Sequence, residues 1–248
     1  MIEQAIQQLK TYFGYDSFRP GQSEVIENVL VGNDTLVVMP TGGGKSLCYQ
    51  VPALCLEGTT IVISPLISLM KDQVDMLTAS GVKAAFINSS LSFDEVQDVM
   101  YQVRSGYIKL LYIAPERLEN DHFCRELSQT QVPLIAIDEA HCISQWGHDF
   151  RPSYRAIHKM LALWQHKPTV IALTATATED VCEDICNTLQ VEPENTFIQG
   201  FARDNLKFTV LTGESKDQFV KNFVKNSPNE AGIIYAATRK SVAVSYTH

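Results

Sequence analysis

A glycine-rich turn between an apolar run and an amphipathic run constrains the fold of this chain more than any other stretch. The residues Thr35-Leu-Val-Val-Met39 lead through Pro-Thr-Gly-Gly-Gly to Lys45 and Ser46. Residues 34–39 predict a buried strand because they are β-branched and aliphatic, and residues 47–56 predict the helix that follows. Glycines at the junction let backbone N–H groups approach an anion, and the helix N-terminus adds unpaired donors. The stretch therefore predicts a phosphate-binding loop.

Each residue of this loop has an expected role in binding ATP. The backbone would surround the phosphates at Thr41, Gly42, Gly43 and Gly44. Lys45 would reach the β- and γ-phosphates as a point charge, and the Ser46 hydroxyl would bind Mg²⁺. Met39 stands where the strict pattern has a glycine, so the loop is a variant of that pattern.

The chain beyond the loop alternates short β-rich runs with stretches of helical periodicity. Strands are predicted at 59–64, 84–88, 108–114, 134–137 and 169–173, and a last one within 195–206. Helices are predicted at 2–12, 22–31, 66–79, 93–104, 116–127, 154–164 and 179–189. This alternation predicts an α/β fold, with a parallel sheet covered by helices on both faces. Ligands of such sheets bind at the carboxyl ends of the strands.

Composition limits the classes of protein that the chain can represent. Lys and Arg total 20 against 28 Asp and Glu, a formal charge of −8, which argues against a basic protein that coats nucleic acid. The apolar runs are far shorter than the ~20 residues of a membrane span, and the N-terminus has no signal-peptide character. We therefore expect a cytoplasmic protein. Cys182 and Cys186, one helical turn apart, are expected to pack as small hydrophobes and not to bind a metal.

The polar stretch at the end of 195–206 is the expected domain boundary. We expect a nucleotide-binding domain at 1–206 and the start of a second domain at 207–248. The second part would hold extended residues at 207–211, a helix at 216–224 and a strand at 232–236. Two or three elements cannot close a core of this type, so we expect the second domain to be incomplete.

An acidic pair follows the predicted strand 134–137. Asp138 would hold Mg²⁺ from the side opposite the phosphate loop, and Glu139 would orient and deprotonate the attacking water. An Asp-Glu pair at a strand end is often only a solvated turn, but here it belongs to the same predicted sheet as the phosphate loop.

An aromatic segment upstream of the loop offers the parts of an adenine site. Tyr15 and Arg19 provide flat faces for stacking, and the Gln22 amide could both donate to adenine N7 and accept from N6. The alternative is a packed aromatic connector with no ligand.

Three motifs together resemble those of superfamily 2 helicases: Met39 to Ser46, Asp138 to His141 and Thr174 to Thr176. Four longer segments are similar to those of the RecQ family of DNA helicases: Phe13 to Gln22, Ser64 to Gln73, Tyr112 to Leu118 and Cys142 to Pro152. The resemblance runs from about residue 12 to residue 232. It implies a RecA-like fold and an ATP-dependent 3′-to-5′ helicase that couples hydrolysis to translocation on single-stranded DNA.

The resemblance also assigns roles to individual residues. His141 would be catalytic with Lys45, Asp138 and Glu139. Contacts with DNA, or coupling of those contacts to hydrolysis, are implied for Ser64, Lys71, Arg117, Gln145, Trp146, His148, Phe150, Arg151, Thr174 and Thr176. The expected partners are single-stranded and duplex-junction DNA, without a membrane, and the expected setting is a monomer on the bacterial nucleoid in repair and recombination. Trp146 and Phe150 suit this role because bases stack on aromatic faces regardless of sequence.

The family's second motor domain ends in an arginine-bearing motif, and this chain stops before one. Because such an arginine can be worth ~10³–10⁵ in rate, we expect the chain alone to bind ATP weakly and to be a poor motor. Three alternatives remain open at this point. They are a P-loop phosphotransferase, a non-catalytic nucleotide-dependent binding module and a superfamily 2 helicase that acts on RNA.

Overall fold

The computed structural model describes residues 1–147, 149–200, 206–213 and 215–238. The chain divides into two compact units, residues 1–201 and 202–248. The division falls near the boundary expected at residue 206, and the identity of the second unit as the start of a further domain stays a prediction. Among the described residues, no helix is long and apolar enough to cross a membrane.

The first unit is built on a seven-stranded sheet in which every pair of neighbours is parallel. The strands lie in the order β3-β4-β2-β5-β6-β1-β7. Their bounds are β1 Thr35–Val38, β2 Thr60–Ile63, β3 Ala84–Ile87, β4 Leu110–Ile113, β5 Leu134–Ile137, β6 Thr169–Thr174 and β7 Thr196–Ile198. The predicted α/β fold with a parallel sheet is therefore confirmed, and every strand predicted before residue 200 forms.

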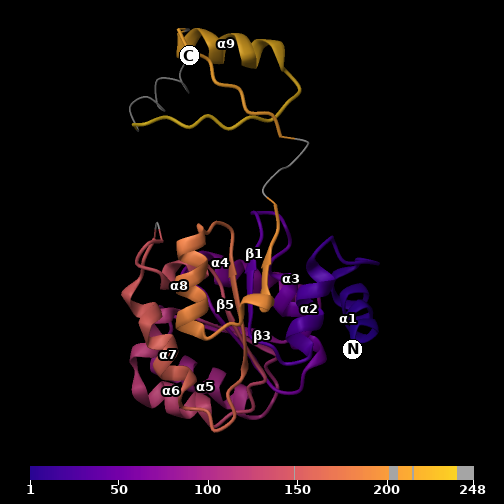
Figure 1. Ribbon diagram of the computed structural model, residues 1–248, viewed down its shortest axis with the longest axis vertical. Coiled ribbons are helices and arrows are strands. Elements are labelled where there is room, and N and C mark those ends of the chain that lie inside the picture. The colour runs from indigo at the N-terminus through magenta and orange to yellow at the C-terminus, as the bar shows by residue number, and fades with distance from the viewer. Residues whose placement is uncertain (148, 201–205, 214, 239–248) are drawn as a thin grey trace. The chain divides into compact units, whose positions relative to one another are not determined.

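Helices cover both faces of this sheet (Figure 1). On one face pack α2 Gln22–Leu30, α3 Leu47–Cys55 and α4 Ile67–Ala79. On the other face pack α5 Phe93–Arg104, α6 Asp121–Ser128, α7 Ala156–Leu161 and α8 Glu179–Leu189. The first helix, α1 Ile2–Gln8, packs through Ala5 on Ile26 of α2 and Val51 of α3.

The period-two alternation of each strand produces these two cores. In β1, Leu36 and Val38 point to the cluster under α5 to α8, whereas Val37 points to the cluster under α2 to α4. All three side chains are buried, as is usual for strands covered on both sides. The strands thus supply the core, and the loops at their carboxyl ends are where a ligand site is expected in such a sheet.

Three predicted helices differ from the helices in the structure. The run 116–127 is split into a 3₁₀ turn, Pro115–Glu119, and α6, because the Asn120 side chain accepts hydrogen bonds from His122 and Phe123 N–H and starts a new helix. The run 154–164 likewise begins as a 3₁₀ turn at Pro152–Arg155, and α7 ends at Leu161. The run 2–12 continues beyond α1 as a π-helical turn, Leu9–Phe13, which ends at Gly14.

The second unit contains α9 Lys216–Asn226, which confirms the predicted helix at 216–224. The strand predicted at 232–236 does not form and these residues are exposed, and the extended residues at 207–211 are not in a strand either. A strand satisfies its backbone only by pairing with another strand, and the described residues of this unit offer none.

Candidate nucleotide site and aromatic loop

The predicted phosphate loop joins the end of β1 to the start of α3, at the carboxyl edge of the sheet. Gly42 and Gly44 have φ of 80° and 84°, the left-handed region that favours glycine. A Cβ on Gly44 would lie 2.4 Å from Gln22 Nε2, and one on Gly43 would lie 2.9 Å from the Pro40 carbonyl oxygen. The loop therefore requires glycine for both its conformation and its close packing.

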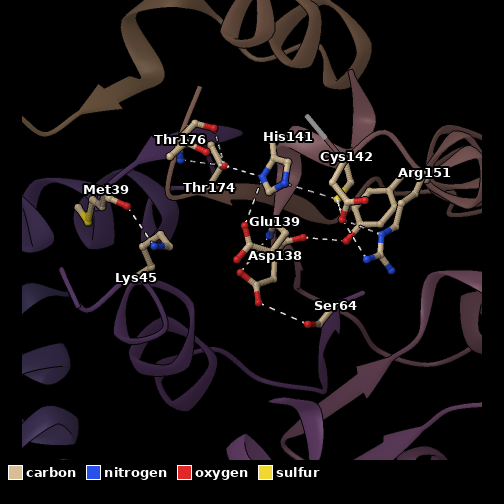
Figure 2. A network of polar contacts seen from close by, with 12 residues as sticks. Met39, Lys45, Ser64, Asp138, Glu139, His141, Cys142, Arg151, Thr174 and Thr176 are labelled. Carbon is tan, nitrogen blue, oxygen red and sulfur yellow. Dashed lines mark hydrogen bonds and ion pairs between the residues drawn. The ribbon is translucent and has the colours of Figure 1, made fainter. Parts of the chain in front are cut away.

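Lys45 and Ser46 follow the glycines where a phosphate would be held. The Lys45 ammonium donates to the carbonyl oxygen of Met39 at 3.0 Å (Figure 2). Ser46 is the N-cap residue of α3. In this arrangement the charge of Lys45 stays beside the loop, where incoming phosphate oxygens could replace the carbonyl as its partner.

Arg19 and Gln22 brace the loop from outside. The Arg19 guanidinium donates to Gly42 O at 2.6 Å, and Gln22 Nε2 donates to Gly44 O at 3.0 Å. Gln22 Oε1 accepts from the Arg19 backbone N–H at 2.8 Å, and the Gln22 side chain is buried. Both ends of the amide thus have partners within the protein, and the adenine contact expected of Gln22 stays a prediction.

A cavity of about 560 Å³ joins the two predicted halves of the site. Tyr15, half exposed, lies on its wall with Arg19 and Gln22. The cavity is also lined by Thr41, Gly42, Gly44, Lys45, Ser46, Asp138 and Glu139. Gly43 does not line it, because its position is turned toward Pro40.

Asp138 begins the acidic pair directly after β5. Its carboxylate accepts from its neighbour, Glu139 N–H, at 3.0 Å and from the Ser64 hydroxyl at 3.4 Å. The Tyr154 hydroxyl donates to the Asp138 carbonyl oxygen at 2.9 Å. Burial, with a smaller effect of the Glu139 carboxylate, raises the pKa of Asp138 to about 6. A bound cation would reverse this shift.

Glu139 has a left-handed backbone, with φ 49° and ψ 47°. Among the non-glycine residues that the structure describes, only Glu139 and Gln190 have a positive φ. Such strain persists where the surroundings impose it, and it is common at functional positions. Glu139 Oε2 lies 3.2 Å from His141 Nδ1, which also lies 3.0 Å from the Thr174 hydroxyl (Figure 2). Two of the predicted catalytic residues, Glu139 and His141, are thereby brought together with Thr174.

The aromatic loop, residues 144–152, leaves the same strand end. Its turn is tight, because a Cβ on Gly147 would lie 2.3 Å from the His141 carbonyl oxygen. The Arg151 N–H donates to Cys142 O at 3.0 Å and closes the loop. Trp146 is 79% exposed, so its ring faces solvent.

The other predicted residues of this loop have different surroundings. Gln145 is exposed. Phe150 is half-buried, and the Arg155 guanidinium lies 5.2 Å from its ring centroid. The Arg151 guanidinium donates to Asp149 and, at 3.1 Å, to the Pro65 carbonyl oxygen. His148 lies outside the described residues.

Four further residues expected to contact or sense DNA are distributed over other elements. Ser64 is buried against Asp138, and Arg117 donates twice to the Asn88 carbonyl oxygen. Lys71 is exposed on α4, and Thr176, also exposed, donates its backbone N–H to the Thr174 hydroxyl. Of these four, Lys71 and Thr176 are exposed, Arg117 is half-buried and Ser64 is buried, and DNA contacts stay predictions for all of them.

Sequence reasoning missed Tyr154, which supports the acidic pair from the aromatic loop's far end. It also missed the polar pair Gln50 and Gln73, which are joined by a 2.9 Å hydrogen bond and line the cavity beside α3 and α4. Helical periodicity placed Gln50 and Gln73 on the predicted helices 47–56 and 66–79, but no local pattern indicates that those helices meet.

Comparisons with known proteins identify the family of the chain. Residues 19–185 match the DEAD/DEAH box helicase family. The chain is 55% identical over 241 residues to an ATP-dependent DNA helicase RecQ of Bacillus subtilis, covering 97% of this chain and 41% of that protein. It is 48% identical to the protein of the same name from Pasteurella multocida, covering 96% of this chain and 38% of that protein. The chain thus spans about two fifths of the length of these curated relatives.

Solved structures support the fold alone. The crystal structure of the DUF1998 helicase MrfA matches with a TM-score of 0.73 at 20% identity, covering 99% of this chain and 40% of that one. The Pyrococcus furiosus Hef helicase domain matches with a TM-score of 0.57 at 22% identity, covering 73% of this chain and 37% of that one. The chain therefore shares the fold of these two structures.

Proposed function

The chain belongs to the DEAD/DEAH box helicase family, and from this membership we propose that it is the nucleotide-binding motor portion of a RecQ-type, ATP-dependent DNA helicase. The observation that carries the proposal is the shared cavity of about 560 Å³, lined by Lys45 and Ser46 on one side and by Asp138 and Glu139 on the other. These residues come from the ends of two different strands. A phosphate cradle and a pair of carboxylates in one cavity are the parts that nucleotide hydrolysis requires.

The residues of the loop fit a nucleotide phosphate. Gly42 and Gly44 line the cavity with left-handed backbones, so the chain can pass close to an anion there with no side chain between them. Lys45 would exchange the Met39 carbonyl for phosphate oxygens. Tyr15, on the cavity wall, would cover the base, with Arg19 and Gln22 beside it.

The donor set also fits Mg²⁺, a hard cation that prefers oxygen ligands. The Ser46 hydroxyl and the Asp138 carboxylate both line the cavity and would hold the ion. Bound there, Mg²⁺ would neutralise charge on the phosphates. Ser64 supports this arrangement from beneath by its hydrogen bond to the Asp138 carboxylate.

Glu139 is the proposed general base. Its carboxylate lines the cavity, where it would accept a proton from the attacking water. His141 and Thr174 would hold that carboxylate in place through the contacts of 3.2 Å and 3.0 Å at His141 Nδ1.

The aromatic loop is proposed to couple DNA binding to this base. The exposed Trp146 ring would stack on bases of a single strand without sequence preference. A shift of the turn at Gly147 would reach the His141 backbone directly, because a Cβ on Gly147 would lie only 2.3 Å from the His141 carbonyl oxygen. The 3′-to-5′ polarity, duplex unwinding and a role in repair and recombination are proposed from the RecQ resemblance.

The same resemblance supports action as a monomer on single-stranded and duplex-junction DNA in the bacterial cytoplasm. Light scattering on the purified chain, with and without a junction oligonucleotide, would test the oligomeric part of this proposal. A stable dimer in either sample would contradict it.

Nucleotide binding provides the first test, because it requires only this chain. A fluorescent ATP analogue with Mg²⁺ should bind, and Lys45→Ala should weaken that binding at least about tenfold, the loss of one charge-assisted contact. Lys83→Ala, on the surface above the Tyr107 ring, is the matched control and should bind as the parent does. Equal binding by the parent and Lys45→Ala would refute the proposal.

Hydrolysis with and without single-stranded DNA is the second test, with full-length Bacillus subtilis RecQ as the positive control. Glu139→Gln should keep nucleotide binding and lose any DNA-stimulated turnover. Phosphate transfer to a small acceptor, in place of release to water, would favour the phosphotransferase alternative. Stimulation by RNA and not by DNA would favour an RNA helicase.

A further inference from the structure

Three potential metal ligands meet where the acidic motif passes into the aromatic loop. His141, Cys142 and Asp149 each offer one ligand atom, and these atoms lie within 4.8 Å of one another. The proposed ATP chemistry gives Cys142 no role, yet its sulfur is buried beside the His141 ring (Figure 2). Among the described residues, this is the one group of three such side chains close enough to share an ion.

The separations are close to those of a tetrahedral zinc site. The Cys142 sulfur lies 3.8 Å from His141 Nε2 and 3.9 Å from Asp149 Oδ2. Zinc bonds of ~2.0–2.3 Å in tetrahedral geometry place ligand atoms about 3.3–3.7 Å apart. All three ligand atoms lie within 4.8 Å of one another, so side-chain shifts of about 1 Å would bring them around one ion.

The histidine ring is already oriented for such a site. Its Nδ1 edge lies 3.2 Å from the Glu139 carboxylate and 3.0 Å from the Thr174 hydroxyl. A metal-binding histidine commonly has a carboxylate on its second nitrogen, which fixes the ring and increases the basicity of the nitrogen that binds. Here the same arrangement directs Nε2 toward Cys142.

We propose that His141, Cys142 and Asp149 form a binding site for a thiophilic divalent cation of the Zn²⁺ class. The thiolate selects Zn²⁺ over Mg²⁺, which prefers oxygen ligands. Binding replaces the Cys142 S–H bond with a metal–sulfur bond and releases the proton to solvent. Water would fill the fourth position, because Asp149 is exposed at the rim of the site.

Occupancy would join the aromatic loop to the acidic motif. Asp149 now accepts hydrogen bonds from Arg151 Nε at 3.2 Å and Nη2 at 3.0 Å. The cation would compete with Arg151 for this carboxylate and connect it to His141, which contacts the proposed base. We expect Zn²⁺ to reduce DNA stimulation of ATP hydrolysis, a consequence that rests on the proposed function, whereas metal binding itself does not.

Cobalt provides a direct spectroscopic test without nucleotide or DNA. Co²⁺ is titrated anaerobically into the reduced, chelator-treated chain, and Zn²⁺ is then added. We expect a sulfur-to-cobalt charge-transfer band that saturates at one equivalent and disappears when Zn²⁺ displaces Co²⁺. Cys142→Ser should abolish the band, and Asp149→Asn should weaken Co²⁺ affinity at least about tenfold, the scale on which metal-site substitutions act.

The matched control is the double variant Cys182→Ser/Cys186→Ser, which removes the cysteine pair on α8. It should keep the band unchanged. The proposal is overturned by a parent chain without the band, a band that survives Cys142→Ser, or a band lost in the control. If Cys142→Ser fails to fold, the Co²⁺ affinity of Asp149→Asn is the deciding measurement, because the exposed Asp149 side chain can change without loss of core packing. Unchanged affinity in that variant also overturns the proposal.

Discussion

The Thr174 hydroxyl lies 3.0 Å from His141 Nδ1, and the Thr174 carbonyl oxygen accepts the Met39 N–H at 3.1 Å. One residue at the end of β6 thus joins the acidic motif to the base of the phosphate loop. Lys45 in turn donates to Met39 O, so contacts run from His141 through Thr174 and Met39 to Lys45, and Figure 2 shows the first and the last of them. A change at either half of the cavity can reach the other through Thr174.

Thr174→Val should separate catalysis from nucleotide binding. Valine keeps the β-branched shape but removes the hydroxyl, so the free energy of unfolding should fall by about 0.5–1.5 kcal/mol. We expect any DNA-stimulated turnover that the parent chain shows to fall at least about tenfold, with the affinity for the fluorescent nucleotide unchanged, and Thr174→Ser to restore that turnover. Equal turnover in the parent and the valine variant would show that His141 does not depend on this hydroxyl.

Asp138→Asn should stabilise the fold in a pH-dependent manner. Burial raises the pKa of Asp138 from 3.8 to about 6, so the folded chain holds its proton more tightly than the unfolded chain. Protonated Asp138 therefore contributes fully to the free energy of unfolding below pH ~4. That contribution, on the order of 2–3 kcal/mol, is lost as the pH rises through ~6. Urea unfolding in metal-free buffer should therefore show the variant more stable than the parent at pH 7.5 and nearly equal at pH 4. An equal difference at both pH values would contradict this origin.

Gly44→Ala should disrupt the phosphate loop for two reasons. Its φ of 84° disfavours any side chain, and a Cβ would lie 2.4 Å from Gln22 Nε2. Gly81→Ala has a comparable φ of 88° with nothing within 4 Å, so it isolates the cost of conformation alone. We expect each variant to lose about 1 kcal/mol of stability through its backbone conformation, and only Gly44→Ala to lose further stability and nucleotide affinity through the contact with Gln22. Parallel losses of affinity in the two variants would rule out the contact with Gln22 as the cause.

Trp146→Ala should weaken binding of single-stranded DNA without affecting the fold. The ring is 79% exposed, so little core packing is lost, whereas base stacking contributes about 1–3 kcal/mol. Fluorescence anisotropy with a labelled oligonucleotide should show a loss of affinity of about tenfold or more, and Trp146→Phe should recover most of it. Tyr107→Ala, also at an exposed aromatic, should leave DNA affinity unchanged.

Ser64→Ala distinguishes two roles for a buried hydroxyl. The RecQ resemblance implies a DNA contact, whereas in the structure the hydroxyl donates to the Asp138 carboxylate at 3.4 Å. If support of Asp138 is its main role, the Mg²⁺ concentration needed for nucleotide binding should rise several-fold and DNA affinity should stay constant. A loss of DNA affinity with unchanged Mg²⁺ dependence would favour the DNA contact.

Local sequence was sufficient for the architecture of the first unit and for the position of its main motifs. Apolar runs of four to six residues with intervening helical periodicity predicted the strands, and Gly42 to Ser46 predicted a phosphate loop, because both follow from short-range sterics. Breaks inside helices were missed at Asn120 and Arg155, where one side-chain cap or one 3₁₀ turn outweighs periodicity.

What only the tertiary structure decided is which side chains become neighbours at the carboxyl edge of the sheet. The order β2-β5-β6-β1 brings Ser64 to Asp138 and Thr174 to His141, although no local pattern encodes it. Long-range strand pairing also directs Arg117 to the Asn88 carbonyl, and the closed aromatic loop brings Asp149 back to Cys142. The physical reason is that periodicity specifies how each segment buries its own apolar face, whereas strand order depends on the packing of all segments together.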